Sequence, residues 1–413
     1  MLDINFIREN FDKVKKATKD KGFDETVLDK LLVVDEKRRK LIQEVEGIRA
    51  ERNKASEARN IEKGKELKEK LQIVESEQKT VDIDFIDLLY KVPNVSADGV
   101  KVGTPEENEV IKTVGEIPKF DFPVRDHLDI GQLTDTIDFE SGAKVAASGF
   151  FYFKNDLAML EVALAGYAFE KLSKKGFTPV ITPNVAKERN IVGCGFQARS
   201  DKERQIYHLE DEDLDLIATS EITLVGMHTD EVLDYKKLPL KYVGYSSCYR
   251  KEIGSYGKDV RGILRVHEFK KIEMVVFCDP AESEKIHEEL LAIEEEVYQE
   301  LEIPYQVIKM VTGDLGNAAS KKYDLEAWMP SQNKYREITS TSNTTDFQAR
   351  RLNIKTKKDN QNVYVHTLNG TVSTTSRTII AILENFQEKD GSVRIPKVLQ
   401  KWMGKEKIVA RHD

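Results

Sequence analysis

The chain has 413 residues, which is too long for a single small domain. Its net charge of −8 argues against binding of nucleic acid through overall charge. Its hydrophobic residues form no run of the ~18 apolar positions that a membrane-spanning helix needs, so we expect no membrane span. Its three cysteines include no C-x-x-C pair, and none stands at metal-ligand spacing from a histidine. Neither a disulfide framework nor a zinc site is therefore expected.

The first residues of the chain, MLDIN, give an expectation about location. They lack the basic start and the long apolar stretch of a secretory signal. We therefore expect the protein to be cytoplasmic.

Two heptad patterns follow in residues 27–88. Apolar residues recur at alternating steps of four and three in two series, the first being Val27, Leu31, Val34, Leu41, Val45 and Ile48, and the second Leu67, Leu71, Val74, Val81, Phe85 and Leu88. This period of 3.5 predicts an antiparallel two-helix coiled coil. Because Arg38, Arg52 and Gln78 interrupt the seams, we expect them to be partly open to water and the hairpin to project as an arm.

The arm has a charge of its own. Residues 36–70 contain twelve Lys or Arg against eight Glu, a positive stretch in a negative protein. An RNA backbone is one partner that this charge fits, and the candidate contacts are Arg38, Arg49, Arg52, Lys54, Arg59 and Lys63. A solvated coiled coil with ordinary surface charges is the simpler interpretation of composition alone. No aromatic residue lies between Phe23 and Phe85, so any RNA would be recognised by shape and phosphate contacts.

Beyond the arm, Pro93 and Asn94 end the helical pattern. We expect an N-terminal domain over residues 1–95, a linker over 96–126 and a second domain over 127–413. In the second domain, helical patterns (157–174, 281–301, 376–387) alternate with strand-like runs (242–250, 264–277, 363–371). This mixture predicts an α+β fold, with helices packed on an antiparallel sheet.

Two of those strand-like runs form a charged hairpin, SSCYRKEIGSYGKDVRGILRVHEFKKIEMV, over residues 246–275. Residues two apart in a strand share a face, which groups Cys248, Arg250 and Glu252 on one run and Arg265, His267, Phe269, Lys271 and Glu273 on the other. A solvent-facing sheet with cross-strand ion pairs would explain this pattern. A binding site would also explain it, with Lys258 and Arg261 of the glycine-rich loop closing over an anion.

A second cation stands out near the C-terminus. HTLNGTVSTTSRTIIAILENFQ reads as a strand entering a helix, which places Arg377 in the first helical turn. A cation there opposes the helix dipole by ~0.3–1 kcal/mol. Exceptions to a local rule cluster at functional sites, and an arginine at a helix N-terminus suits a polyphosphate. An arginine that reaches sideways to a surface carboxylate is the alternative.

Weaker signals complete the set. Glu337 and Ser340 would suit a hydrated Mg²⁺ beside phosphates. Thr219 and Glu221 would equally form a helix-capping turn. No G-x-x-x-x-G-K-[ST] and no G-x-G-x-x-G after a strand occurs, so any use of ATP requires another fold.

Taken together, these segments resemble the class II aminoacyl-tRNA synthetases. The Arg250-x-Glu252 and RVHEF segments resemble motif 2, the late strand and helix with Arg377 resemble motif 3, and residues 176–183, GFTPVITP, resemble the dimer-forming motif 1. The similarity is closest to seryl-tRNA synthetases, through the ordered segments LIATSEI, LPLKYVGYSSCYRKE, GILRVHEFKKIEM, YDLEAWMP, REITSTSNTTDFQARR and IPKVLQKWMG, and it covers the whole chain. It implies a class II antiparallel catalytic domain with a tRNA-binding arm.

The resemblance also implies roles for residues. ATP would contact Arg250, Lys251, Glu252, Val266, Phe269, Glu337, Ile338, Thr339, Ser340 and Arg377, with Phe269 stacked on adenine, Glu252 near its amino group and Arg377 on the γ-phosphate side. Serine would contact Thr219, Ser220, Glu221, Arg250, Glu273, Asn369 and Thr371. Mg²⁺ would accompany ATP at Glu337 and Ser340. Arg250 and Arg377 would be the catalytic residues.

The family implies a homodimer that joins L-serine to tRNA(Ser), with the selenocysteine tRNA as a further candidate substrate. Two other functions are compatible with the sequence. One is a relative that activates a small amino acid and loads a carrier protein, which the basic arm argues against. The other is a non-catalytic paralogue that binds tRNA, which the retention of every charged motif residue argues against.

Overall fold

A computed structural model describes residues 1–196, 205–253 and 262–411. The chain divides into two compact units, residues 1–95 and 96–413. No helix in the described parts is long and apolar enough to span a membrane.

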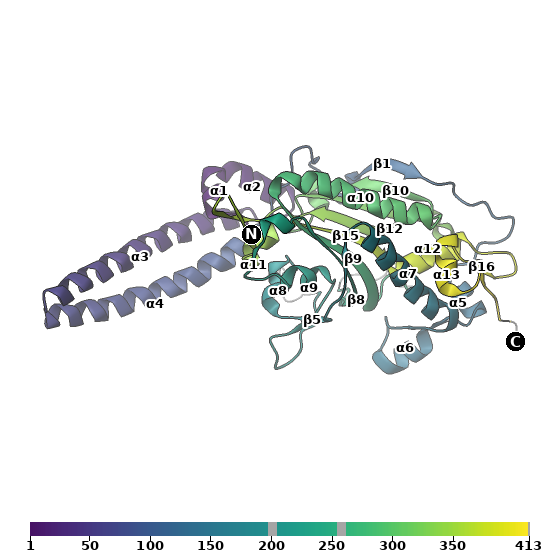
Figure 1. Ribbon diagram of the computed structural model, residues 1–413, viewed down its shortest axis with the longest axis horizontal. Helices are drawn as coiled ribbons and strands as arrows, with labels where there is room; N and C mark the ends of the chain where they lie inside the picture. The colour runs from purple at the N-terminus through teal and green to yellow at the C-terminus, as the bar shows by residue number, and fades with distance from the viewer. Residues whose placement is uncertain (197–204, 254–261, 412–413) are drawn as a thin grey trace. The chain divides into compact units, whose positions relative to one another are not determined.

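The N-terminal unit is helical throughout. Two short helices, α1 (Ile4–Glu9) and α2 (Phe11–Asp20), precede α3 (Thr26–Glu57) and α4 (Ile61–Lys91). The helices α3 and α4 pack side by side along their length, which confirms the predicted coiled coil (Figure 1). The buried seam consists of Leu41, Val45, Ile48 and Ala55 from α3 and Leu67, Leu71, Val74 and Val81 from α4.

Helix α3 also buries a charged side chain near the base of the arm, which the heptad pattern did not indicate. Asp35 is only 1% exposed, while Arg8 and Arg39 reach its carboxylate at 3.3 and 3.2 Å. Arg38 forms an ion pair with Asp82 at 2.7 Å and lies over the ring of Phe85. A buried carboxylate requires such partners, because an unpaired charge is too costly to remove from water.

The second unit is built on one mixed sheet. Its eight described strands follow the order β1-β10-β11-β12-β15-β9-β8-β4, and all neighbours are antiparallel except β4 and β8. Their bounds are Glu109–Val114 (β1), Tyr305–Lys309 (β10), Lys321–Met329 (β11), Lys334–Asn343 (β12), His366–Thr374 (β15), Glu268–Cys278 (β9), Leu240–Tyr249 (β8) and Thr178–Ile181 (β4). The predicted α+β fold with an antiparallel-dominated sheet is confirmed.

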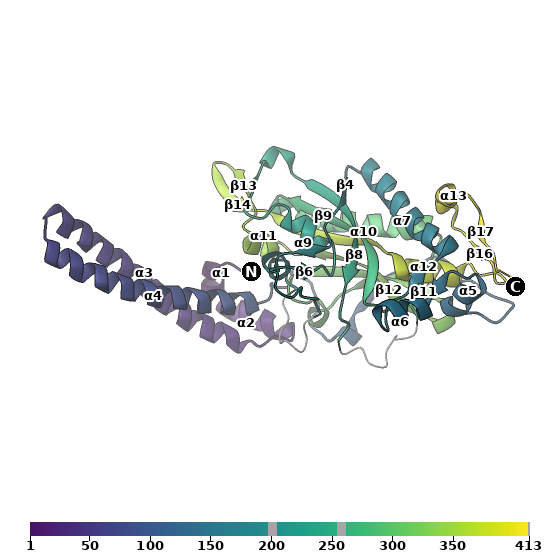
Figure 2. The same cartoon turned by 90° about the horizontal axis from the view of Figure 1, so that it is seen from below.

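Helices cover the sheet unequally (Figures 1 and 2). The large core packs one face against the long helices α7 (Asn155–Lys174), α10 (Ser283–Glu300) and α12 (Thr375–Asn385), with α13 (Lys397–Met403) on α7. Short helices α8 (Glu188–Gly193), α9 (Glu221–Gly226) and α11 (Phe347–Leu352) pack on part of the opposite face. Because these helices cover only part of the second face, the remainder has room for a ligand-binding site.

Smaller elements complete the unit. They are α5 (His127–Leu133), α6 (Phe139–Ala146) and the short strands β2 (Ile137–Asp138), β3 (Tyr152–Phe153), β5 (Val185–Ala186), β6 (Asp215–Leu216), β7 (Val232–Leu233), β13 (Lys355–Lys358), β14 (Gln361–Tyr364), β16 (Val393–Arg394) and β17 (Lys407–Ile408). Strands β7, β13 and β14 form a separate three-stranded sheet.

Three elements differ from the sequence-based expectation. Strand β9 begins at Glu268, so Arg265 and His267 precede the strand that was expected to contain them. The strand expected over 363–371 is two strands, β14 and β15, which lie in different sheets. Within the segment expected to be a linker, residues 109–114 form the edge strand β1, whose residues are almost all exposed. The sequence of β1, EVIKTV, lacks the alternation of apolar and polar residues that would reveal a strand.

The helix α10 carries a buried carboxyl group into the sheet. Glu294 is fully buried and accepts a hydrogen bond of 2.7 Å from the Thr339 hydroxyl. Burial raises the pKa of Glu294 well above its ordinary value, and the negative charges of Glu273 and Asp324 add to the effect. Glu294 is therefore held as the neutral acid in the folded protein.

This raised pKa predicts a pH-dependent stability. The folded protein keeps the Glu294 proton to higher pH than the unfolded chain does, so the stabilisation is full below the unfolded pKa and is lost as pH rises towards the folded pKa. We expect urea unfolding between pH 5 and 9 to show the parent losing stability relative to Glu294→Gln. The difference in the free energy of unfolding should grow by up to about 1.4 kcal/mol per pH unit. A constant difference across this range would contradict the assignment.

Candidate functional site

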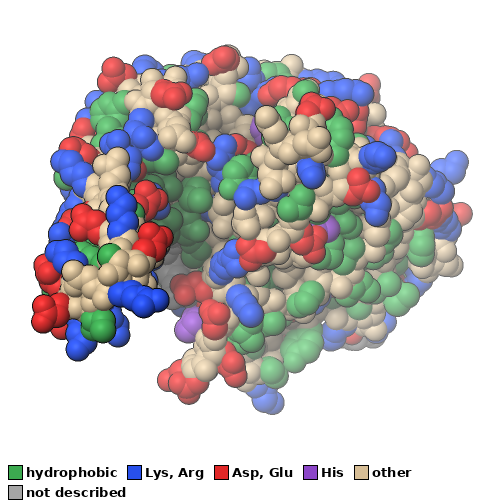
Figure 3. Space-filling model, turned by 60° about the vertical axis from the view of Figure 1, so that its left-hand side comes forward, with side chains coloured by type: hydrophobic (Ala, Val, Ile, Leu, Met, Phe, Trp, Pro, Cys, Tyr) green, Lys and Arg blue, Asp and Glu red, His purple; other side chains and the backbone are tan. Residues whose placement is uncertain are grey.

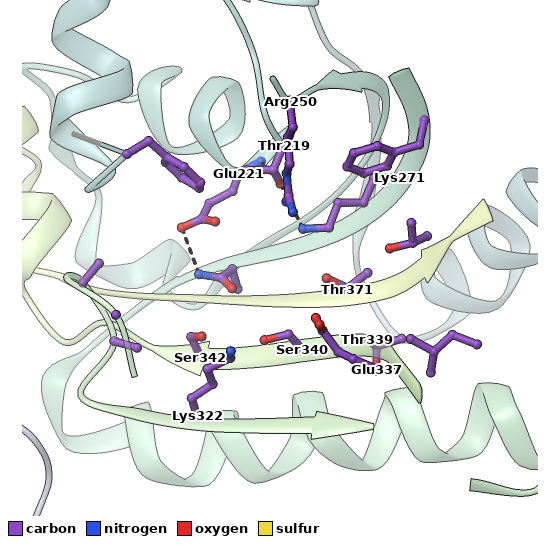
Figure 4. A pocket seen from close by; sticks show the side chains of 18 of the residues that line it. Thr219, Glu221, Arg250, Lys271, Lys322, Glu337, Thr339, Ser340, Ser342 and Thr371 are labelled. Carbon is purple, nitrogen blue, oxygen red and sulfur yellow. Dashed lines mark hydrogen bonds between the residues drawn. The ribbon is translucent and has the colours of Figure 1, made fainter. Parts of the chain in front are cut away.

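A cavity of about 360 Å³ lies on the second face of the large sheet, and Figure 4 shows the side chains around it. Thirteen of the residues to which the resemblance gave a role line it: Thr219, Glu221, Arg250, Glu252, Val266, Phe269, Glu337, Ile338, Thr339, Ser340, Asn369, Thr371 and Arg377. They come from segments more than 150 residues apart in the chain. The fold therefore brings the two charged constellations and the Thr219 turn to one place.

Strand alternation explains why this face is polar. In β9, Ile272, Met274 and Val276 face the large core, whereas Phe269 and Lys271 line the cavity. The charged side of this strand is not solvent-facing, because Lys271 is 8% and Glu273 1% exposed. The alternative of a solvent-facing sheet surface is wrong for these two residues, which are buried beside the cavity.

Arg250 is fixed by its backbone at the end of β8. Its N–H donates to the His267 carbonyl at 3.0 Å, and the Nδ1–H of His267 donates back to the Arg250 carbonyl at 3.0 Å. The guanidinium lies over the Phe269 ring, 5.2 Å from its centroid. A cation over an aromatic face is attracted to its quadrupole, so this arrangement holds the arginine at the cavity wall.

Arg377 lies in the first turn of α12 and reaches Glu337 on β12. Its Nη1 donates to the Glu337 carbonyl at 2.9 Å and lies 3.2 Å from the carboxylate. Burial acts to raise the pKa of Glu337, but Arg377 and Lys322 outweigh it and lower the pKa to about 2. The side chain is 49% exposed at the cavity wall, and the neighbouring cations decide its charge.

A second corner of the cavity holds buried carboxylates. Glu221 accepts hydrogen bonds from Gln348 at 2.6 Å and from Asn369 at 2.9 Å. Burial raises the pKa of Glu221 to about 7, the charge of Glu273 adds to the effect, and Lys271 acts against it. Thr371 donates to Glu273 at 3.0 Å across the β15–β9 pair. This corner offers negative charge and hydroxyl partners to a small ligand.

The floor of the cavity offers oxygen donors for a hard cation. Glu337 and Ser340 both line it, and Asp324 is the cross-strand neighbour of Ser340. The Oδ1 atom of Asp324 is buried and accepts no hydrogen bond, although Lys322 lies 3.5 Å away. Of these oxygens, the Glu337 carboxylate and the Ser340 hydroxyl line the cavity and are donor types that Mg²⁺ takes beside phosphates, whereas Asp324 lies behind them. The residues present therefore fit this metal.

Two family models match the chain. Residues 1–96 match the seryl-tRNA synthetase N-terminal domain, and residues 206–386 match the class II core domain of the tRNA synthetases for G, H, P, S and T. A serine–tRNA ligase of Borrelia garinii subsp. bavariensis is 46% identical over 420 residues, which cover 98% of both chains. One from Dictyoglomus turgidum is 44% identical over 422 residues, covering 99% of both. The chain belongs to the seryl-tRNA synthetase family.

Solved structures agree with this assignment. A seryl-tRNA synthetase of Pyrococcus horikoshii, complexed with ATP, is 41% identical and superposes with a TM-score of 0.93 over 100% of both chains. A cytoplasmic serine–tRNA ligase of Naegleria fowleri, in complex with AMP, is 34% identical with a TM-score of 0.88, covering 100% of this chain and 99% of the other. The resemblance stated from the sequence is confirmed, and so is the prediction of an ATP-dependent ligase.

Three residues that the resemblance implied do not line the cavity. Lys251 lies over the Tyr207 ring, and Ser220 is buried at the start of α9. Glu273 lies directly behind the cavity wall, where it contacts the lining residues Thr371 and Lys271. The loop residues Lys258 and Arg261 lie outside the described residues.

Other lining residues were missed from the sequence. They are Leu264, Lys322, Ser342, Thr344, Thr374 and Ser376, together with residues 194–196 and 314–319. Arg265 and Lys271 also line the cavity, as the charged face of the hairpin indicated, although the resemblance gave neither a role. Lys322 was not expected, because no local pattern marks the face of β11 on which it lies.

The contact of Gly149 with His267 predicts a remote effect on Arg250. Gly149 has φ +86°, and a Cβ added there would lie 2.4 Å from the His267 ring. Gly149→Ala should therefore displace His267, whose carbonyl and ring both hydrogen-bond the Arg250 backbone, and should lower the kcat/KM of ATP–pyrophosphate exchange by about tenfold or more. Gly99→Ala is the matched control, because Gly99 has φ +81° and an added Cβ would meet nothing within 4 Å. Equal activity in the two variants would show that His267 does not position Arg250.

Proposed function

We propose that the chain activates L-serine with ATP to seryl-adenylate and then transfers the seryl group to the 3′ end of tRNA(Ser). The observation that supports this most strongly is that Arg250 and Arg377, 127 residues apart in the chain, line one cavity together with the Glu221 corner. Two cations and a nearby anionic corner match a triphosphate and an amino acid. Serine and the serine tRNA are the substrates that the family implies.

The amino acid is proposed to bind at the Glu221 corner. The ionised Glu221 takes the α-ammonium, and Arg250 takes the carboxylate. Glu273 and Thr371 hydrogen-bond the side-chain hydroxyl, with Thr219 and Asn369 closing the pocket. Such a pocket rejects alanine, because buried polar groups would be left without partners, and rejects threonine by volume.

ATP is proposed to bind at the other end. Phe269 stacks on adenine after Arg250 moves from the ring to the substrate, and Glu252 lies near the adenine amino group. Arg377 holds the γ-phosphate side. Glu337 and Ser340 hold Mg²⁺, with Asp324 as a neighbouring acceptor, and when bound the metal supplies positive charge to the phosphate oxygens.

The chemistry needs charge stabilisation and alignment. The serine carboxylate is already ionised, so its oxygen attacks the α-phosphorus without a general base, and pyrophosphate leaves in line with that attack. Arg250 reduces the negative charge that develops at the α-phosphate. In the second step the terminal ribose hydroxyl of the tRNA attacks the acyl carbonyl, and AMP leaves.

The arm is proposed to hold tRNA(Ser), and the selenocysteine tRNA is a further candidate. Within the fully described arm, Arg52, Lys54 and Arg59 form no ion pair, whereas Arg49 and Lys63 pair with Glu75 and Glu66. Acidic and basic side chains are mixed over the face seen in Figure 3 rather than gathered in one basic area. Contacts to the RNA backbone would then come from the unpaired cations near the tip.

A homodimer is proposed through the segment that resembles motif 1. Apolar side chains on its helix and strand are exposed, with Met159 and Val162 at 50% and 60% and Ile181 at 79%. Burying such residues against a second copy would remove them from water. A cytoplasmic location is proposed as well, because translation consumes the charged tRNA there.

Serine-dependent ATP–pyrophosphate exchange tests the proposal directly. The parent should exchange with serine, and Arg250→Ala should lower kcat/KM by ~100-fold or more, because a charge-assisted contact to the reacting phosphate is lost. Robust exchange with another amino acid and none with serine would exclude the proposal. Loading of a carrier protein or an absence of turnover would favour the two alternative functions.

An arm variant provides the control. Arg52→Ala with Lys54→Ala should leave exchange unchanged, because this step does not use tRNA, and should weaken tRNA charging in a salt-dependent manner.

A further inference from the structure

Lys271 is a cavity cation to which neither the sequence nor the family resemblance gives a role. Its ammonium lies 2.7 Å from the Glu273 carboxylate and donates to the Thr219 hydroxyl at 3.1 Å. The side chain is buried on β9 and still lines the cavity, where Figure 4 shows it opposite Glu337 and Ser340. It thus touches two residues of the proposed serine pocket at once.

The surroundings make this ammonium the main counter-charge of the corner. The charged and titratable groups that face Glu221 are Glu273 and Lys271 from β9, Arg250 at the end of β8 and Cys194 after α8, and its neutral partners are Gln348 from α11 and Asn369 from β15. Arg250 is committed to the substrate carboxylate in the proposed function. Of these groups, Lys271 then remains to compensate two buried carboxylates.

We propose that Lys271 is a specificity-determining residue, which keeps Glu273 ionised and oriented as an acceptor for the hydroxyl of the amino acid. This inference rests on the proposed function. With Lys271 present, Glu273 accepts from Lys271 and Thr371 and retains capacity for one more donor, the serine hydroxyl. An amino acid without that hydroxyl leaves a buried acceptor unsatisfied.

Removing the ammonium reverses this logic. Two buried carboxylates without a counter-charge repel each other, so one of them, Glu273, takes up a proton. Glu273 then carries a donor of its own and no longer requires one from the ligand. Serine loses its advantage over alanine, and the pocket also binds the α-ammonium less well, because Glu221 is ionised at higher pH only.

The test is ATP–pyrophosphate exchange with serine and with alanine for Lys271→Met, which keeps the length of the chain without its charge. The ratio of kcat/KM for serine over alanine should fall about tenfold or more. The acid-side midpoint of the serine profile should move to higher pH. Lys270→Met is the control, because the neighbouring Lys270 contacts Ser247 and Glu268 instead. A serine-to-alanine ratio within about threefold of the parent would overturn the proposal.

A double variant guards against simple misfolding. In Lys271→Met with Glu273→Gln the pair is neutral, so position 273 keeps no charge without its partner, and Glu221 loses the negative neighbour together with the positive one. If Lys271 acts through Glu273, the double variant and Glu273→Gln alone should have the same serine-to-alanine ratio within about threefold. A further tenfold loss in the double variant would overturn the inference. Loss of serine-dependent exchange in the parent itself would instead refute the proposed function.

Discussion

Buried charge is the constraint on which the catalytic unit depends. One face of the large sheet carries ionised side chains, and each is tolerated only where an opposite charge or several hydrogen bonds lie within reach. Glu337 is compensated by Arg377 and Lys322, and Glu273 by Lys271 and Thr371. Glu221 is less well compensated, because burial and the charge of Glu273 outweigh Lys271 and its amide partner Gln348 and raise its pKa to about 7. The cavity is thus prepared for a ligand with its own positive and negative groups.

The hydrophobic core on the opposite side of the sheet fixes the positions of these side chains. Alternate residues of β9 and β15 enter the large core, so the same strands that present Lys271 and Thr371 are fixed by Met274 and Leu368 on the other side. Register across the sheet then sets which polar groups meet, as Thr371 meets Glu273. Function resides in side chains whose positions are determined by packing on the opposite face.

Much of this could be predicted from the sequence, and the reasons are local. The heptad seams predict the arm because a sustained period of 3.5 is typical of coiled coils, and the motif segments predict the site because their order matches one family. The burial of Asp35 in α3 and the strand β1 in the expected linker could not be predicted. A buried carboxylate depends on Arg8 and Arg39 folding back onto it, and an edge strand depends on a partner almost 200 residues away. The burial of the β9 charges likewise depends on helices elsewhere in the chain.

The proton on Glu221 offers the most direct test of the electrostatic design. L-serine would be titrated calorimetrically into the full chain saturated with a non-hydrolysable ATP analogue, in buffers of different ionisation enthalpy. Because the pKa of Glu221 is about 7, binding of the ammonium at pH 7 should release about half a proton, and the release should vanish by pH 9. Serine binding at pH 7 without any proton release would contradict the role given to the buried carboxylates.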